Sequence, residues 1–209
     1  ITAGPTHEPI DAVRFIGNRS SGKMGFALAE AFIQQGALVT LVAGPVQLSP
    51  PIGVHEYVRV ETAQEMYDAA VERFGTADIA VAAAAVADAR PKSPAQHKLH
   101  KNELPQAIEL EPTLDILATW GAHKQTGQTV VGFALETDEG TTSAQAKLAR
   151  KNADFIVLNS TAVEGAGFGT DTNQITIFEQ GGNSHKFELK SKAAVAKDIV
   201  QTLLKTLDS

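Results

Sequence analysis

Strand-like apolar segments alternate along this chain with segments whose apolar residues recur at helical spacing. A capping box formed by Thr62 and Glu65 marks the start of one of the expected helices. Because strands separated by helices pair in parallel, the alternation predicts an α/β fold, a doubly wound, Rossmann-like and mostly parallel sheet. In the first half we expect strands at 1–3, 37–43, 54–60 and 78–85, and helices at 22–36 and 62–75.

The second half continues this alternation after a segment with little apolar periodicity. Residues 89–105 contain three prolines, which predicts a long loop, and a loop of this length suits a lid. The last two predicted strands, joined through Gly181-Gly182-Asn183, form a late antiparallel hairpin. We expect strands near 107–111 and at 129–135, 154–159, 174–179 and 185–189, and helices at 113–120, 141–152 and 191–207. We therefore expect a single domain over 1–209.

Composition and charge exclude several functional classes. The 209 residues include no cysteine, which removes thiol nucleophiles, thiolate zinc sites and iron–sulfur clusters. The formal net charge is −6, from 18 basic and 24 acidic residues, and argues against a nucleic-acid partner. The longest apolar run, 79–87, is much shorter than the roughly 20 residues that cross a bilayer, so we expect no membrane partner.

A glycine-rich segment precedes the first predicted helix. Gly17-Asn-Arg-Ser-Ser-Gly22-Lys23-Met24 fits the first seven positions of a P-loop, but Met24 stands where a P-loop carries Ser or Thr. Residues 5–16 also separate this segment from the first strand, which disfavours a true P-loop. A helix N-terminus that holds some other anion is favoured, and a purely structural glycine-rich cap is the alternative.

Three further features each allow a functional and an ordinary interpretation. Asp88 follows a buried strand, where an acid commonly binds a ribose hydroxyl, but it can equally begin a turn. The basic segment His97-Lys98-Leu99-His100-Lys101 suits a lid over a polyphosphate, although a solvated loop is the commoner case. Lys147 and Lys151 share a helix face, where like charges are unfavourable unless an anion lies between them.

The longest motif covers residues 1–25, ITAGPTHEPIDAVRFIGNRSSGKMG, and resembles the signature of bacterial phosphopantothenoylcysteine synthetase. Three more blocks are similar to the family in the same order: Ala84–Asp88, Gly132–Thr137, and Lys147 with Lys151. The resemblance implies a ligase that joins 4'-phosphopantothenate to L-cysteine through an acyl-cytidylate, converting CTP to CMP and pyrophosphate. It also implies Mg²⁺ bound with CTP, no flavin in this domain, a homodimer and a cytoplasmic location.

The same family is usually the C-terminal half of a bifunctional coenzyme A biosynthesis protein. The resemblance therefore implies that a flavin-dependent decarboxylase domain precedes this domain in the full-length chain. A first residue Ile1 in place of an initiator methionine fits an excised domain, and we expect one on this ground.

The resemblance also implies functional residues. Asn18 would offer an amide donor near the acyl carbonyl, Asp88 would hold the ribose and Phe133 would line the base pocket. The catalytic set is Asn18, Arg14, Ala85 and Lys98. The nucleotide-binding set is Ala82, Ala83, Ala84, Asp88, Lys98, Leu114, Asp115, Ile116, Leu117, Phe133, Lys147 and Lys151, in which the lysines would bind the triphosphate. No metal ligand is assigned.

Two blocks depart from the family pattern. Where the family has Lys-x-Lys-Lys, this chain has Lys98-Leu-His100-Lys101. Where the family has Asn-Pro-Asp-Ile, it has Thr113-Leu-Asp-Ile116. The alternatives are a Rossmann-like nucleotide- or flavin-binding reductase and a non-catalytic nucleotide-binding module. The reductase lacks a Gly-x-Gly-x-x-Gly loop after the first strand and a Tyr-x-x-x-Lys pair. The choice between CTP and ATP stays open.

Overall fold

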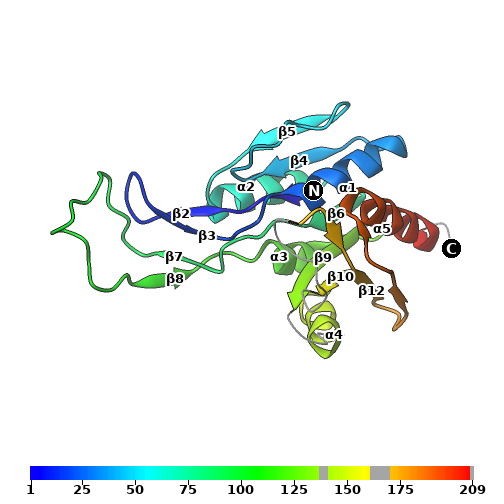
Figure 1. Cartoon of the computed structure of the whole chain (residues 1–209). Helices are drawn as coiled ribbons and strands as arrows, with labels where there is room; N and C mark the ends of the chain where they lie inside the picture. Colours follow the sequence, from blue (N-terminus) through cyan, green and yellow to red (C-terminus); the bar gives the residue numbers. More distant parts are fainter. Residues whose placement is uncertain (137–140, 161–169, 208–209) are drawn as a thin grey trace.

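A computed structural model of the chain describes residues 1–136, 141–160 and 170–207. Its centre is one eight-stranded sheet (Figure 1). Across the sheet the order is β13 (Ser184–Lys186), β12 (Ile175–Glu179), β10 (Phe155–Ser160), β9 (Thr129–Glu136), β6 (Ile79–Ala82), β1 (Thr2–Ala3), β4 (Thr40–Ala43) and β5 (Glu56–Arg59). The strands from β10 to β5 pair in parallel, and β12 and β13 pair antiparallel.

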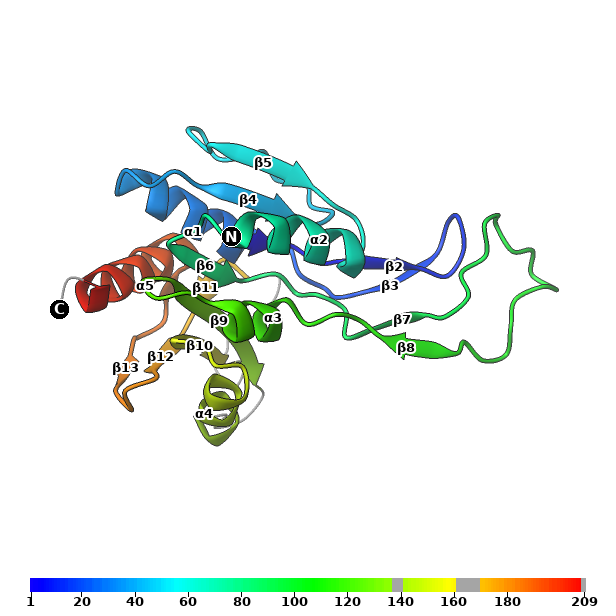
Figure 2. The same ribbon diagram turned by 180° about the vertical axis from the view of Figure 1, so that it is seen from behind.

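Helices cover both faces of this sheet (Figures 1 and 2). α1 (Lys23–Gln34) and α5 (Lys192–Leu207) pack together in one apolar core, and α2 (Ala63–Phe74), α3 (Ile116–His123) and α4 (Thr141–Arg150) contribute to the other. Neighbouring strand residues such as Ile156 and Val157 enter opposite cores, as the pleat of a strand requires. The predicted doubly wound α/β fold with a late antiparallel hairpin is confirmed.

The prediction of a loop over 89–105 is wrong at its start. β7 (Ala89–Pro91) pairs antiparallel with β8 (Leu110–Pro112), so the strand expected near 107–111 lies outside the main sheet. The ion pairs Arg90–Glu111 and Lys92–Glu109 link the two sides of this ribbon. Three-residue strands are too short to show a period-two pattern, and the prolines favoured a loop.

A second short ribbon precedes α1 and was not predicted. β2 (His7–Pro9) pairs antiparallel with β3 (Phe15–Gly17), and the rings of His7 and Phe15 stack across it. The β2–β3 and β7–β8 ribbons lie side by side and project away from the sheet in both views (Figures 1 and 2). We call residues 7–17 and 89–112 together the arm. A further small pair joins β11 (Thr172–Asn173) to β14 (Lys190–Ser191).

The buried carboxylate of Asp11 holds the two parts of the arm together. It accepts hydrogen bonds from the backbone N–H groups of Val13, Arg14 and Leu99, at 2.8, 2.7 and 3.2 Å, and pairs with the Arg14 guanidinium. Burial opposes ionisation of Asp11, but these hydrogen bonds prevail and lower its pKa to about 2. Asp11 therefore links the two parts of the arm and holds Arg14 beside residues 97–101, which we call the basic loop.

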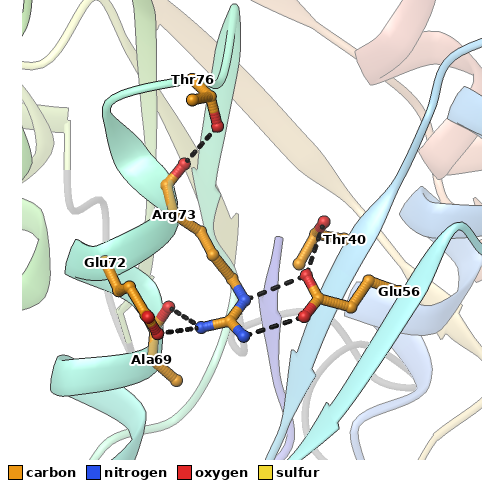
Figure 3. A network of polar contacts seen from close by, with 6 residues as sticks. All are labelled: Thr40, Glu56, Ala69, Glu72, Arg73 and Thr76. Carbon is orange, nitrogen blue, oxygen red and sulfur yellow. Dashed lines mark hydrogen bonds and ion pairs between the residues drawn. The ribbon is translucent and has the colours of Figure 1, made fainter.

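Arg73 ties α2 to the edge of the sheet (Figure 3). Its guanidinium donates to both carboxylate oxygens of Glu56 in β5, at 3.0 and 2.8 Å, and also to Glu72 and to the carbonyl of Ala69. Thr40 of β4 adds a hydrogen bond to Glu56 at 3.3 Å. The hydrogen bond from Arg73 is the main reason that the pKa of Glu56 is lowered.

Replacing Arg73 with methionine is expected to lower the free energy of unfolding by about 0.5 kcal/mol at neutral pH, because solvent screens a pair of this exposure. The Arg73 and Glu56 side chains are 30% and 40% exposed. A carboxyl whose pKa falls on folding adds stability above its unfolded pKa and loses it as pH falls through the folded pKa. The difference in stability between Arg73→Met and wild type should therefore shrink as the pH falls below 4.5, the ordinary pKa of a glutamate side chain.

Urea unfolding at neutral pH and at acidic pH measures this difference. Lys92→Met, which breaks the ion pair with Glu109 on the arm, is the control. An equal loss of stability at both pH values would contradict the assignment of the pKa shift to Arg73.

None of the described helices combines the length and apolar character that a membrane crossing requires.

Candidate active site

The sheet changes its direction of winding at β1. From β1 the chain passes through α1 to β4 on one side, while β6 lies on the other side. The segments that leave β1 and β6 stay close together, since Ala85 N–H donates to Gly4 O at 2.8 Å and Ala87 N–H donates to Thr6 Oγ1 at 3.0 Å. In such sheets the crevice at the carboxyl ends of these strands is the usual ligand site.

Two adjoining cavities open at this edge of the sheet. The α1 cavity, of about 240 Å³, is lined by Asn18, residues 20–25, 83–85 and 133–135, Asn159, Asn173 and Lys192. The Lys147 cavity, of about 360 Å³, is lined by Thr2, Ala82, residues 84–86, Asp88, residues 113–117, Phe133, Lys147 and Lys151. Ala84, Ala85 and Phe133 belong to both linings, so the cavities meet at the ends of β6 and β9.

The Lys147 cavity brings together nearly all of the residues predicted to bind nucleotide. Ala82, Ala84, Asp88, Leu114, Asp115, Ile116, Leu117, Phe133, Lys147 and Lys151 line it. Ala83 lines the α1 cavity, and Lys98 lines neither. These residues lie in or directly after β6, β9 and α4 and at the start of α3, and the fold brings these segments together.

Two lysines give the Lys147 cavity a positive wall. Lys147 Nζ donates to the carbonyl of Phe133 at 2.7 Å, and Lys151 pairs with Asp115. Asp115 also caps α3 by accepting from the N–H of Ala118 at 2.8 Å. Burial lowers the pKa of Lys147, whereas Asp115 opposes that change. Burial opposes ionisation of Asp115, but its bonds to Lys151 and Ala118 prevail and lower its pKa.

Asn18 stands at the junction of the two cavities. Its side-chain Nδ2 donates to the carbonyls of Ala85 at 2.9 Å and Val86 at 3.1 Å. Both N–H groups of the Asn18 amide are therefore directed at the main chain after β6. To donate to an acyl carbonyl, Asn18 must exchange one of these bonds. The structure thus brings together Asn18 and Ala85, two members of the expected catalytic set.

The start of α1 forms a wall of the α1 cavity. Its N-cap is Gly22, in the left-handed region with φ 78°, and among the described residues no side chain caps the first turn. A Cβ on Gly25 would lie 2.5 Å from the Cβ of Ala3, so only glycine permits this close packing of α1 on β1. Lys23, which also lines this cavity, pairs with Asp171 at 2.5 Å.

Three buried polar residues of the α1 cavity were missed from the sequence: Asn159, Asn173 and Lys192. Burial, followed by the nearby charge of Lys23, lowers the pKa of Lys192, and Asp171 opposes the change. The side-chain oxygen of Asn159 has no hydrogen-bond partner within the described part of the chain. A polar residue directly after an apolar run, as in Phe-Ile-Val-Leu-Asn159, was the available signal.

Two predicted catalytic residues lie elsewhere. Arg14 and Lys98 are on the arm and line neither cavity. Arg14 donates to the carbonyl of Leu99 at 3.3 Å, and Lys98 is exposed. Within one chain, the structure therefore brings Arg14 close to the basic loop and leaves both away from Asn18.

A doubly wound sheet with two adjoining cavities at its switch point, a glycine-rich helix start and lysines that are buried or half-buried is typical of α/β proteins that bind anionic ligands. The comparisons with known proteins narrow this class. A profile of the DNA/pantothenate metabolism flavoprotein C-terminal domain matches residues 1–207. The chain belongs to this family, and the predicted resemblance is confirmed at that level.

Curated relatives and a solved structure agree with the family. A protein from an unknown prokaryotic organism, named cysteine/cysteine sulfinic acid decarboxylase, is 52% identical over 98% of this chain and 57% of its own length. The coenzyme A biosynthesis bifunctional protein CoaBC of Bacillus subtilis strain 168 is 46% identical over 97% of this chain and 50% of its own. The chain thus spans about half the length of the curated relatives it matches.

The solved structure is described as the C-terminal domain of a coenzyme A biosynthesis bifunctional protein CoaBC. It is 41% identical to this chain, with a TM-score of 0.84, and the match covers 99% of this chain and 93% of that one. The fold described above is therefore the fold of that domain.

Proposed function

We propose that this chain is a phosphopantothenate–cysteine ligase, which joins 4'-phosphopantothenate to L-cysteine with CTP in the cytoplasm. The observation that carries the proposal is the Lys147 cavity, where the residues implied for nucleotide binding meet beside Asn18 and Ala85. The family match over residues 1–207 and the similarity to CoaBC proteins support it.

In the first step, a carboxylate oxygen of phosphopantothenate attacks the α-phosphorus of CTP. The new P–O bond forms as the bond to the β-phosphate oxygen breaks, and pyrophosphate leaves with that electron pair. Lys147 and Lys151 would bind the phosphates and offset the charge that develops on oxygen. Asp88 would hold the ribose, and the backbone of residues 82–84 would contact the base, where the small alanine side chains permit a close approach.

In the second step, the amine nitrogen of cysteine attacks the acyl carbon of the acyl-cytidylate. A C–N bond forms, the C–O bond to the phosphate breaks, and CMP leaves with the electron pair. The nitrogen loses a proton, which passes to the departing phosphate or to water. Asn18 would position the acyl group at the junction of the cavities, together with the main chain at Ala85.

Mg²⁺ fits this site as a companion of the triphosphate. The described residues contain no group of three or more His, Cys, Asp or Glu side chains that could hold a metal ion. Asp88 and Asp115 are the carboxylates that line the Lys147 cavity, and Asp115 is paired with Lys151. A site with few carboxylates is suited to Mg²⁺, because this ion is bound largely by substrate phosphates and water. When bound, Mg²⁺ would offset the negative charge of the phosphates.

The arm supports a homodimer. It carries large apolar side chains with substantial exposure, among them Val13 at 61%, Phe15 at 51% and Leu110 at 49%. Exposed apolar side chains gathered on a projection are typical of an interface between subunits. We propose that the arm of one subunit brings Arg14 and Lys98 to the cavities of its partner.

Release of pyrophosphate tests the proposed function. The protein is incubated with CTP, Mg²⁺ and phosphopantothenate, with and without cysteine, and the series is repeated with ATP. We expect pyrophosphate release that requires phosphopantothenate, and CMP only after cysteine is added. Binding of CTP without pyrophosphate release would instead favour the non-catalytic binding module, and turnover of a nicotinamide or flavin cofactor would favour the reductase.

A further inference from the structure

Two threonine hydroxyls hold Ala87, the residue directly before Asp88. Thr6 Oγ1 accepts from the N–H of Ala87 at 3.0 Å, and Thr113 Oγ1 donates to the carbonyl of Ala87 at 2.6 Å. The N–H of Thr113 also donates to the carbonyl of Asp88, at 3.0 Å. Ala87 and Thr6 are buried, so water does not readily replace these partners. The backbone that leads into Asp88 is therefore fixed by side chains from two other segments.

The Asp88 carboxylate itself is held only through its backbone. Asp88 is exposed and lines the Lys147 cavity, and within the described ranges no hydrogen bond or ion pair is made to its carboxylate. An aspartate side chain is short, so its carboxylate moves with the backbone to which it is attached. Thr113 contacts the carbonyls of the peptide groups on both sides of Asp88. The place of the carboxylate thus depends on Thr113.

The hydroxyl of Thr113 adds a bond that the arm does not need. Thr113 follows β8, which leads on into α3 (Figure 2). Its N–H bond to Asp88 continues the β7–β8 ladder beyond the pair Ala89 and Pro112. Any residue with a backbone N–H could make that bond, whereas the bond to the Ala87 carbonyl requires a side-chain donor. Thr113 also lines the Lys147 cavity, so its hydroxyl acts at the edge of the proposed nucleotide site.

We propose that Thr113 is a positioning residue for the nucleotide: its hydroxyl fixes the backbone at Ala87 and Asp88 and so aims the Asp88 carboxylate at the ribose. This inference rests on the proposed function, since it takes Asp88 as the group that binds the ribose of CTP. The ribose does not react, so its contact contributes equally to the ground state and the transition state. Thr113 therefore acts on the affinity for the nucleotide and not on the rate of the chemical step.

Thr113→Val tests the inference, because valine has a similar volume and keeps the N–H but has no hydroxyl. We expect the Kd for CTP, measured by calorimetry with Mg²⁺, to rise on the order of 10-fold. The kcat for pyrophosphate release at saturating CTP should stay within about twofold of wild type. Thr113→Ser keeps the hydroxyl and should restore most of the affinity. Thr202→Val is the matched control, since Thr202 Oγ1 donates to the carbonyl of Asp198 at 2.8 Å in α5 and lines neither cavity.

Asp88→Ala shows whether Thr113 acts through Asp88. Without that carboxylate, Thr113→Val should raise the Kd for CTP by less than about twofold, because the two residues form one unit. A similar rise with and without Asp88 would overturn the inference, and so would an unchanged Kd, which would leave Thr113 a purely structural role. Thermal unfolding checks that each variant is folded, and Thr113→Ala replaces the valine variant if that protein does not fold. The proposed function fails separately, if wild type binds CTP but releases no pyrophosphate with phosphopantothenate.

Discussion

Replacing Asn18 with aspartate is expected to lower kcat for amide formation on the order of 10³-fold, as for loss of a positioned donor at a reacting carbonyl. The carboxylate of aspartate has the shape of the amide but cannot donate to the carbonyls of Ala85 and Val86, which lie 2.9 and 3.1 Å from Asn18 Nδ2. It would also place a negative charge beside an anionic acyl-phosphate. Amide formation followed by CMP release measures the effect.

Asn18→Leu separates the two causes of that loss. Leucine also lacks the donor but brings no charge, so it should be impaired less than aspartate if repulsion contributes. Both variants lose the two hydrogen bonds to Ala85 and Val86, so thermal unfolding checks that each variant is folded before the activities are compared. Full activity of either variant would remove Asn18 from the reaction.

The main sheet could be predicted because its strands and helices carry long, regular apolar patterns. Val130 and Val131 are both apolar because each faces a different helical layer, which is the pattern of a strand buried on both faces. The arm could not be predicted in the same way. Its ribbons are held by cross-strand pairs such as Arg90–Glu111 and by hydrogen bonds to Asp11, which leave no period in the sequence.

The candidate site divides along similar lines. Asp88 and Phe133 were predicted from the resemblance, and the order of the strands brings both to the Lys147 cavity. Asn159 and Lys192 were missed because they come from the last strand and helix of the parallel fold, far in sequence from the glycine-rich segment they face. In the proposed homodimer the arm of a second subunit would bring Arg14 to Asn18, and a contact between two chains leaves no periodic pattern in the sequence of one chain.

Replacing Arg14 with alanine is expected to reduce ligation on the order of 10²-fold, because a cation near the developing negative charge is lost. Asp11 would lose its ion-pair partner but keep the three backbone donors, Val13, Arg14 and Leu99, so the arm should stay folded. Arg14→Lys keeps the charge without the planar donor geometry and serves as the control. Steady-state ligation at saturating CTP measures the loss.

Mixing Arg14→Ala with Asn18→Asp decides which subunit uses the arm. Random exchange makes half of the dimers mixed, and if the arm serves the partner, each mixed dimer holds one site with both residues intact. About a quarter of wild-type activity should then return from two nearly inactive proteins. If the arm serves its own cavity, every site in the mixture keeps one defect and no activity returns. Co-purification with two different affinity tags isolates the mixed dimer, whose activity should reach about half of wild type by the same symmetry.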